Sequence, residues 1–180
     1  VRSVSNPDTT PVMNAAVNLT VLVYSSPSPV AVLGSTIPLD GLDRRMMHAH
    51  LRAEPFSGRK TIVAIHNYRS NSTGAGSSGG DRKSSRWYEV DVTSGTPVLR
   101  QSGSLFDPAA APSSYWNGGI AKNGQGHIFM SATHGGPTLR AGIGSAGRLS
   151  DSPLGTLSDP LQIVNSASEY NVQISGTSQR

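Results

Sequence analysis

The stretch Tyr115–Ser131, YWNGGIAKNGQGHIFMS, decides the fold class of this 180-residue chain. It contains two short apolar runs joined by a tight turn at Asn123–Gly126, where two glycines supply the backbone freedom that a hairpin needs. Two further short runs follow, separated by residues typical of turns. We therefore predict one antiparallel unit with strands at Tyr115–Lys122, Gly126–Thr133, Thr138–Gly144 and Leu161–Val164.

The same order of runs occurs once earlier in the chain. The second unit is predicted to have strands at Met46–Glu54, Lys60–Asn67, Ser85–Val92 and Pro97–Ser102. A partial copy precedes it, in which Asn18–Tyr24 and Pro29–Gly34 match the third and fourth strands. Units of four short strands repeated about every 50 to 65 residues are typical of the blades of a β-propeller.

The sequence thus predicts an all-β fold of antiparallel four-stranded β-propeller blades. About two and a half blades are present, so we expect an incomplete ring or a fragment. The expected divisions are a partial blade at 1–43, a complete blade at 44–111, a complete blade at 112–168, and the start of a further blade or a linking strand at 169–180.

Composition fits an extracellular β protein with a lean core. Aromatic residues make up only 6% of the chain, so we expect valine, isoleucine and leucine to build most of the interior. Cysteine is absent, which excludes disulfide and thiol chemistry. No apolar run is long enough for a membrane span, and Val1 fits either a mature chain after signal removal or an internal fragment. Residues expected to be largely buried are Ile62, Val63, Trp87, Ile120, Ile128 and Ile163.

The net charge of +4 raises the question of nucleic-acid binding. The basic residues are scattered over turns and strand ends, with Asp81, Glu89 and Asp91 among them, and form no cluster interleaved with aromatic side chains. We expect no nucleic-acid partner and interpret the basic residues as a solvated face.

A glycine- and serine-rich stretch, Ser70–Ser85, separates the second and third strands of the earlier complete unit. It is either a flexible binding loop or a tolerated insertion. The insertion is favoured, because ordering such a loop costs much entropy and gains little enthalpy.

Three histidines are candidate metal ligands. His48 and His50 are two residues apart and therefore point to the same face of a strand, and His66 lies on the predicted neighbouring strand. Three imidazoles could bind zinc. Roles in packing or hydrogen bonding are the alternative, because no carboxylate or cysteine lies at ligand spacing. With no phosphate-binding loop or hydrolase motif present, no cofactor is expected.

Several motifs resemble, in their order along the chain, a group of secreted bacterial β-propeller proteins that are loosely related in fold to sialidases. The similarity spans Leu39–Arg180 and implies a secreted or extracellular location, at the cell surface, without bringing established catalytic residues. The motifs are Arg45–His48, His66–Tyr68, Arg86–Val90, Gln101–Gly103, Tyr115–Trp116, Gly119–Ala121, Ala146–Arg148 and Ser152–Thr156.

Two functions follow as hypotheses. One is a non-catalytic extracellular module acting as a structural, adhesion or binding scaffold for glycan or protein, and the other is a fragment of a sialidase-like glycoside hydrolase. Sialidase chemistry needs carboxylate and tyrosine groups with an arginine cluster, which this chain could supply, although the Asp-box turn of sialidase blades is absent. The candidate binding residues are Arg86, Tyr88, Glu89, Tyr115, Trp116 and Arg148.

The ends of the predicted stack suggest partners. Asn171–Ile174 alternates polar and apolar residues like a strand that lacks a neighbour. We expect the remaining blades of the same propeller or neighbouring subunits to cover such ends, with glycan as a further possible partner.

Overall fold

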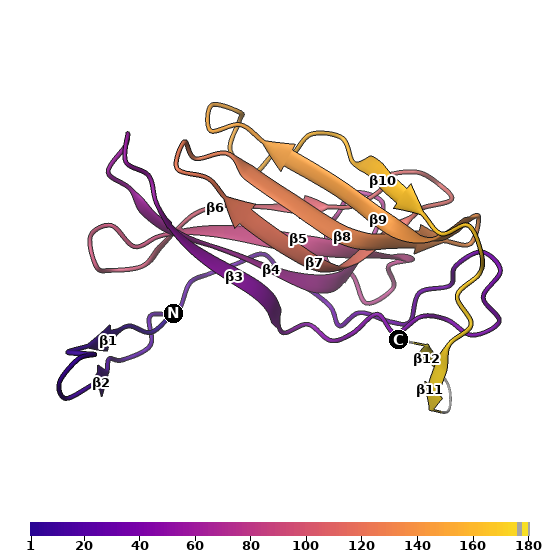
Figure 1. Ribbon diagram of the computed structural model, residues 1–180, viewed down its shortest axis with the longest axis horizontal. Helices are drawn as coiled ribbons and strands as arrows, with labels where there is room; N and C mark the ends of the chain where they lie inside the picture. Colours follow the sequence, from indigo (N-terminus) through magenta and orange to yellow (C-terminus); the bar gives the residue numbers. More distant parts are fainter. Residues whose placement is uncertain (176–177, 180) are drawn as a thin grey trace.

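The computed structural model describes residues 1–175 and 178–179, and two stacked antiparallel sheets dominate it (Figure 1). Each sheet is a simple meander of four strands in sequence order. The first sheet contains β3 (Met46–Ala53), β4 (Lys60–Ser70), β5 (Arg82–Asp91) and β6 (Val98–Leu105). The second contains β7 (Ser114–Lys122), β8 (Ile128–Gly136), β9 (Leu139–Arg148) and β10 (Leu161–Asn165). The prediction of antiparallel four-stranded sheets is confirmed, and the described residues contain no helix.

The partial unit predicted near the N-terminus does not form. Residues 18–34 contain no strand and make only isolated bridges, Ser25 to Arg69 and Val30 to Leu39. The prediction was wrong because Val30 and Val32 pack against Trp116 of the second sheet instead of joining a ladder, whereas Leu22 and Val23 are largely exposed. The remaining short strands are β1 (Val4–Ser5), β2 (Val12–Met13), β11 (Gln173–Ser175) and β12 (Ser178–Gln179). Residues 176, 177 and 180 of the predicted further unit lie outside the described residues.

The turn between β7 and β8 has the predicted hairpin chemistry. The Asn123 Oδ1 atom accepts hydrogen bonds from the backbone N–H groups of Gln125 and His127, each 3.0 Å long. Gly126 has a φ of 89°, a left-handed conformation that residues with a Cβ rarely adopt. Local sequence therefore determines this hairpin.

The two sheets are stacked in the same sense. Strand β7 lies against β3, β4 and β5. The Nδ1 atoms of His48 and His50 on β3 accept hydrogen bonds from the N–H groups of Ile120 and Lys122 on β7, so the two strands run in the same direction. Figure 1 shows the strands of both sheets in the same order, with β7 over the first three strands of the first sheet.

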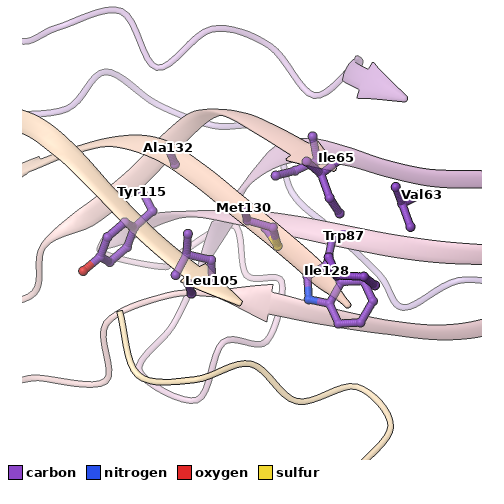
Figure 2. Packing of buried hydrophobic residues seen from close by; sticks show 10 residues of the cluster. Val63, Ile65, Trp87, Leu105, Tyr115, Ile128, Met130 and Ala132 are labelled. Atoms are coloured by element: carbon purple, nitrogen blue, oxygen red, sulfur yellow. The ribbon is translucent and has the colours of Figure 1, made fainter. Parts of the chain in front are cut away.

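The main core fills the space between the sheets (Figure 2). Trp87 is completely buried, and Val63, Ile120 and Ile128 are also buried, as predicted. Ile62 is only half-buried because it points to the other face of β4. Ile163 is 57% exposed and that prediction was wrong, because this residue lies at a bulge in the edge strand β10. The full core comprises Val63, Ile65, Trp87, Leu105, Tyr115, Ile120, Ile128, Met130, Ala132 and Ala146.

A second apolar cluster explains the course of the N-terminal segment. Val30, Val32 and Leu39 pack with Trp116 on the side of the second sheet that faces away from the first. Burying these side chains favours holding the segment against the second sheet. The backbone N–H of Leu33 also donates hydrogen bonds to the carbonyl oxygens of Gly136 and Leu139 there.

Candidate functional site

A buried ion network joins the two sheets. The Lys122 Nζ atom on β7 donates to Glu54 Oε1 at 2.5 Å, to Thr61 Oγ1 at 2.9 Å and to Glu89 Oε1. The other carboxylate oxygen of Glu89 accepts hydrogen bonds from Arg100, at 2.8 Å, and from Gln101. These six residues, Glu54, Thr61, Glu89, Arg100, Gln101 and Lys122, are called the Lys122 network below.

The electrostatics of the Lys122 network keep both carboxylates ionised. Burial alone would raise the pKa of Glu89, but hydrogen bonds from Lys122 and Gln101, together with the charges of Lys122 and Arg100, outweigh it and hold the pKa below its usual range. The pKa of Glu54 is lowered in the same way, with Lys122 and Ser57 opposing the effect of burial. Glu89 is 0% exposed, and its carboxylate accepts hydrogen bonds from three side chains. Because Lys122 lies on the second sheet and Glu89 on the first, the network connects the two sheets.

Arg148 lies near this network. It is buried, and its Nη2 atom donates to the carbonyl oxygen of Ser152 at 2.6 Å. Burial lowers its pKa, while the nearby charge of Glu89 acts in the opposite direction. Two of the predicted binding residues, Glu89 and Arg148, thus belong to the interior between the sheets.

A second polar cluster occupies the other face of the first sheet. His66 and Tyr88 share a hydrogen bond of 2.9 Å, and their rings are stacked with centroids 5.6 Å apart. The guanidinium carbon of Arg86 lies 4.3 Å from the ring centroid of Tyr68. Tyr24, from the N-terminal segment, contacts the His66 ring edge-on. We call Tyr24, His66, Tyr68, Arg86 and Tyr88 the His66 cluster.

Arg86 fastens irregular segments to this face. Its Nη1 atom donates to the carbonyl oxygens of Leu22 and Val23, and its Nη2 atom donates to the carbonyl oxygen of Gly74. Tyr68 also donates to the carbonyl of Gly74, at 2.6 Å. The glycine- and serine-rich loop is thus tied to buried side chains at Gly74.

Burial shifts the pKa values of His66 and Tyr88 in the directions that favour their neutral forms. Burial, with a smaller effect from the charge of Arg86, lowers the pKa of His66 to about 4. Burial also raises the pKa of Tyr88 to about 12. His66 and Tyr88 are therefore neutral near pH 7, and their hydrogen bond is one between uncharged groups.

The predicted three-histidine metal site is not formed. In the register of β3 and β4, His48 lies opposite Ile65 and His50 opposite Val63, facing the second sheet. His66 directly follows Ile65 on β4, and its side chain therefore points to the opposite face of the sheet. His48 and His50 accept hydrogen bonds from β7 instead. Within the part of the chain that the structure describes, no three potential ligands among His, Asp and Glu come together.

Tyr115 and Trp116 are adjacent in sequence but lie on opposite faces of the second sheet. Tyr115 faces the main core, where its ring stacks on that of His134 with centroids 6.0 Å apart. Trp116 lies in the second apolar cluster. The six predicted binding residues are thus distributed over three places. Arg86 and Tyr88 lie on the outer face of the first sheet, Glu89, Arg148 and Tyr115 lie between the sheets, and Trp116 lies on the outer face of the second sheet.

A cavity of about 710 Å³ lies beside Arg86. Its walls include Leu22, Gly74 and Phe106, and Asp159 comes from the segment between β9 and β10. The guanidinium of Arg86 is only slightly accessible there, because its own carbonyl partners line the same cavity. The accessible walls of this cavity are mostly apolar.

Sequence reasoning missed Lys122 and Tyr68, which organise the two polar clusters. A signal for Lys122 was present, because it is two residues from Ile120 and so shares its inward face. For Tyr68 the corresponding signal was its position two residues after His66, which puts both side chains on the same face of a strand.

Comparison of the chain with models of protein families, with curated proteins and with solved structures gives no match. No helix in the described residues is long and apolar enough to cross a membrane.

Proposed function

We propose that this chain is a non-catalytic module of a secreted β-propeller protein at the cell surface. In this function the four-stranded units act as blades, and their surface serves as a structural, adhesion or binding scaffold for glycan or protein. The partners would be the remaining blades of the same propeller or neighbouring subunits. Stacking of two meanders in the same order and direction supports this proposal.

The observation that carries the non-catalytic part is the use of Glu89. A glycosidase carboxylate must reach the sugar or its attacking water. The carboxylate of Glu89 instead has no exposed surface and is saturated by Lys122, Arg100 and Gln101. Arg86 is likewise occupied by backbone carbonyls. These charged groups hold segments and sheets together.

A fluorogenic sialoside, measured together with thermal unfolding, tests the proposal. We expect no turnover by the unmodified chain. The Glu89→Gln variant should melt at a lower temperature, because Lys122 and Arg100 lose a charged partner in the interior. Turnover that is abolished in Glu89→Gln, with an unchanged melting temperature, would instead establish the sialidase-like hydrolase.

Glu169→Gln is the matched control. The Glu169 side chain is exposed and pairs with Arg140 only at 3.8 Å. Removing this charge should change neither the melting temperature nor the response to the sialoside. The control separates the general effect of losing a carboxylate from the specific effect of losing the one between the sheets.

A further inference from the structure

The second sheet presents an uncharged apolar face on the side away from the first sheet. Phe129, Ile143, Leu161 and Val164 point outward there, and each is about half exposed or more. We call these four residues the Phe129 face. Ile143 and Val164 are direct cross-strand partners, and Leu161 lies opposite Ser145 on the same side.

The paired strand positions around the Phe129 face carry no charged side chain that points outward, and one acidic residue, Asp40 of the N-terminal segment, lines a pocket with Trp116 and Thr133 on this side. In the strand register, the other outward positions are small or neutral: Trp116, Gly119, Ala121, Ser131, Thr133, Ser145 and Gly147. In an antiparallel sheet that has one face in water, the residues on that face are normally polar. Several exposed apolar side chains on one sheet face favour an interaction site.

The stacking of the two sheets indicates what covers this face. Both sheets have the same strand order, and β3 and β7 run in the same direction. The second sheet is therefore related to the first by a shift along the stacking direction, and it is not turned over. The side of the second sheet that faces away from the first is thus equivalent to the side of the first sheet that the second one covers.

That equivalent side of the first sheet is fully packed. Val63, Ile65 and Trp87 lie on it at 0% exposure beneath β7 and β8. The approach is close because β7 is small at Gly118, where an added Cβ would lie 2.6 Å from the Ile65 Cδ1 atom. Apolar side chains on this side of the first sheet are therefore covered, whereas the four residues of the Phe129 face on the second sheet stay exposed in the part of the chain that the structure describes.

We propose that the Phe129 face binds a third four-stranded antiparallel unit, stacked in the same sense and presenting an apolar inner face. The inference rests on the proposed function and identifies the surface and the kind of partner. The second apolar cluster already shows polypeptide packed on this side of the sheet, at Trp116, and the Phe129 face continues from it through the Trp116, Thr133, Ile143 and Val164 row.

Cysteine labelling can test the proposal, since the chain has no cysteine of its own. Ser131→Cys places a thiol on the Phe129 side, and Ser94→Cys places one on the exposed turn between β5 and β6. To test docking, the chain is extended after residue 180 by a second copy of residues 112–168, which supplies a further four-stranded unit. In that copy Lys122→Met removes a lysine for which the uncharged Phe129 face offers no carboxylate.

We expect maleimide to label Ser131→Cys at least about ten-fold more slowly in the extended chain than in the original chain, because docking limits access to the opened state. Labelling of Ser94→Cys should not change. Phe129→Asp in the original unit should restore fast labelling. Equal rates for Ser131→Cys with and without the copy would overturn the proposal, as would a copy that stays unfolded by circular dichroism.

Concentration dependence distinguishes a second copy of the whole chain from a third unit. If Ser131→Cys in the original chain is labelled more slowly at high protein concentration, and sedimentation shows a dimer that Phe129→Asp dissociates, then the proposed occupant is wrong. Phe56→Asp is the control, since Phe56 is 89% exposed on the β3–β4 hairpin. The sialoside assay is independent of these results, so hydrolysis would disprove the proposed function without altering the docking measurement.

Discussion

Lys122 on β7 donates a hydrogen bond to Glu89 on β5, and the two side chains are 1% and 0% exposed. One buried ion pair therefore connects the two sheets. Lys122 also reaches Glu54, so its ammonium group lies between two carboxylates, which pair in addition with the less buried Arg100 and Arg59.

Replacing Lys122 tests how much this ion pair between the sheets contributes to stability. In Lys122→Met both carboxylates lose their ammonium partner while remaining buried, so we expect the free energy of unfolding to fall by about 3 to 5 kcal/mol. Urea denaturation measures the change. The triple variant Glu54→Gln, Glu89→Gln, Lys122→Met should recover much of the loss, because it buries no uncompensated carboxylate at these positions. A loss below about 1 kcal/mol for Lys122→Met would assign the pair to a solvated region.

Stability should depend on pH through His66. Its pKa is about 4 in the folded chain and 6.5 ordinarily, so between these values the unfolded chain binds the proton more readily. The contribution of the neutral, buried His66 to the free energy of unfolding is complete above pH 6.5, decreases as the pH falls, and is lost by about pH 4. The loss amounts to about 3 kcal/mol.

Urea unfolding between pH 4 and pH 7.5 measures this dependence. His66→Gln should have a flatter profile than the original chain, with the remaining slope due in part to His134, whose pKa burial also lowers. A His66→Gln profile parallel to that of the original chain would contradict the assignment.

Gly118 and Gly119 form a matched pair for testing the contact between sheets. An added Cβ at Gly118 would lie 2.6 Å from Ile65 Cδ1, whereas at Gly119 it would meet nothing within 4 Å. Gly118→Ala should destabilise the chain by about 1 to 3 kcal/mol through overpacking. Gly119→Ala should be close to neutral.

Ile65→Val removes the methyl group that Gly118→Ala would meet. In a double-mutant cycle measured by thermal and urea unfolding, the two changes together should therefore cost less than the sum of their separate costs. Additive costs would show that the strain at Gly118 arises elsewhere.

Trp87 is the largest side chain of the main core. Trp87→Ala should lower the free energy of unfolding by about 3 to 5 kcal/mol, because it removes buried contacts and leaves a cavity. Phe56→Ala removes an aromatic side chain that is 89% exposed and should have little effect. A loss under about 1 kcal/mol for Trp87→Ala, measured by urea unfolding, would place the indole at the surface.

The sequence by itself determined where the eight long strands lie. Alternating apolar residues and turn residues such as Asn123 and Gly126 act over a few positions, and the hairpin they predict is present with its expected hydrogen bonds. The same local pattern failed at 18–34, because a strand also needs a neighbouring edge, and a single sequence segment does not contain that information.

Only the tertiary structure decided which side chains meet. His66 is separated from His48 and His50 by the parity of the register between β3 and β4, since a shift of one residue moves a side chain to the opposite face. Glu89 and Lys122 are 33 residues apart, and only the stacking of two sheets brings them together. Strand positions follow from short-range patterns, whereas the polar clusters depend on register and on packing between distant segments.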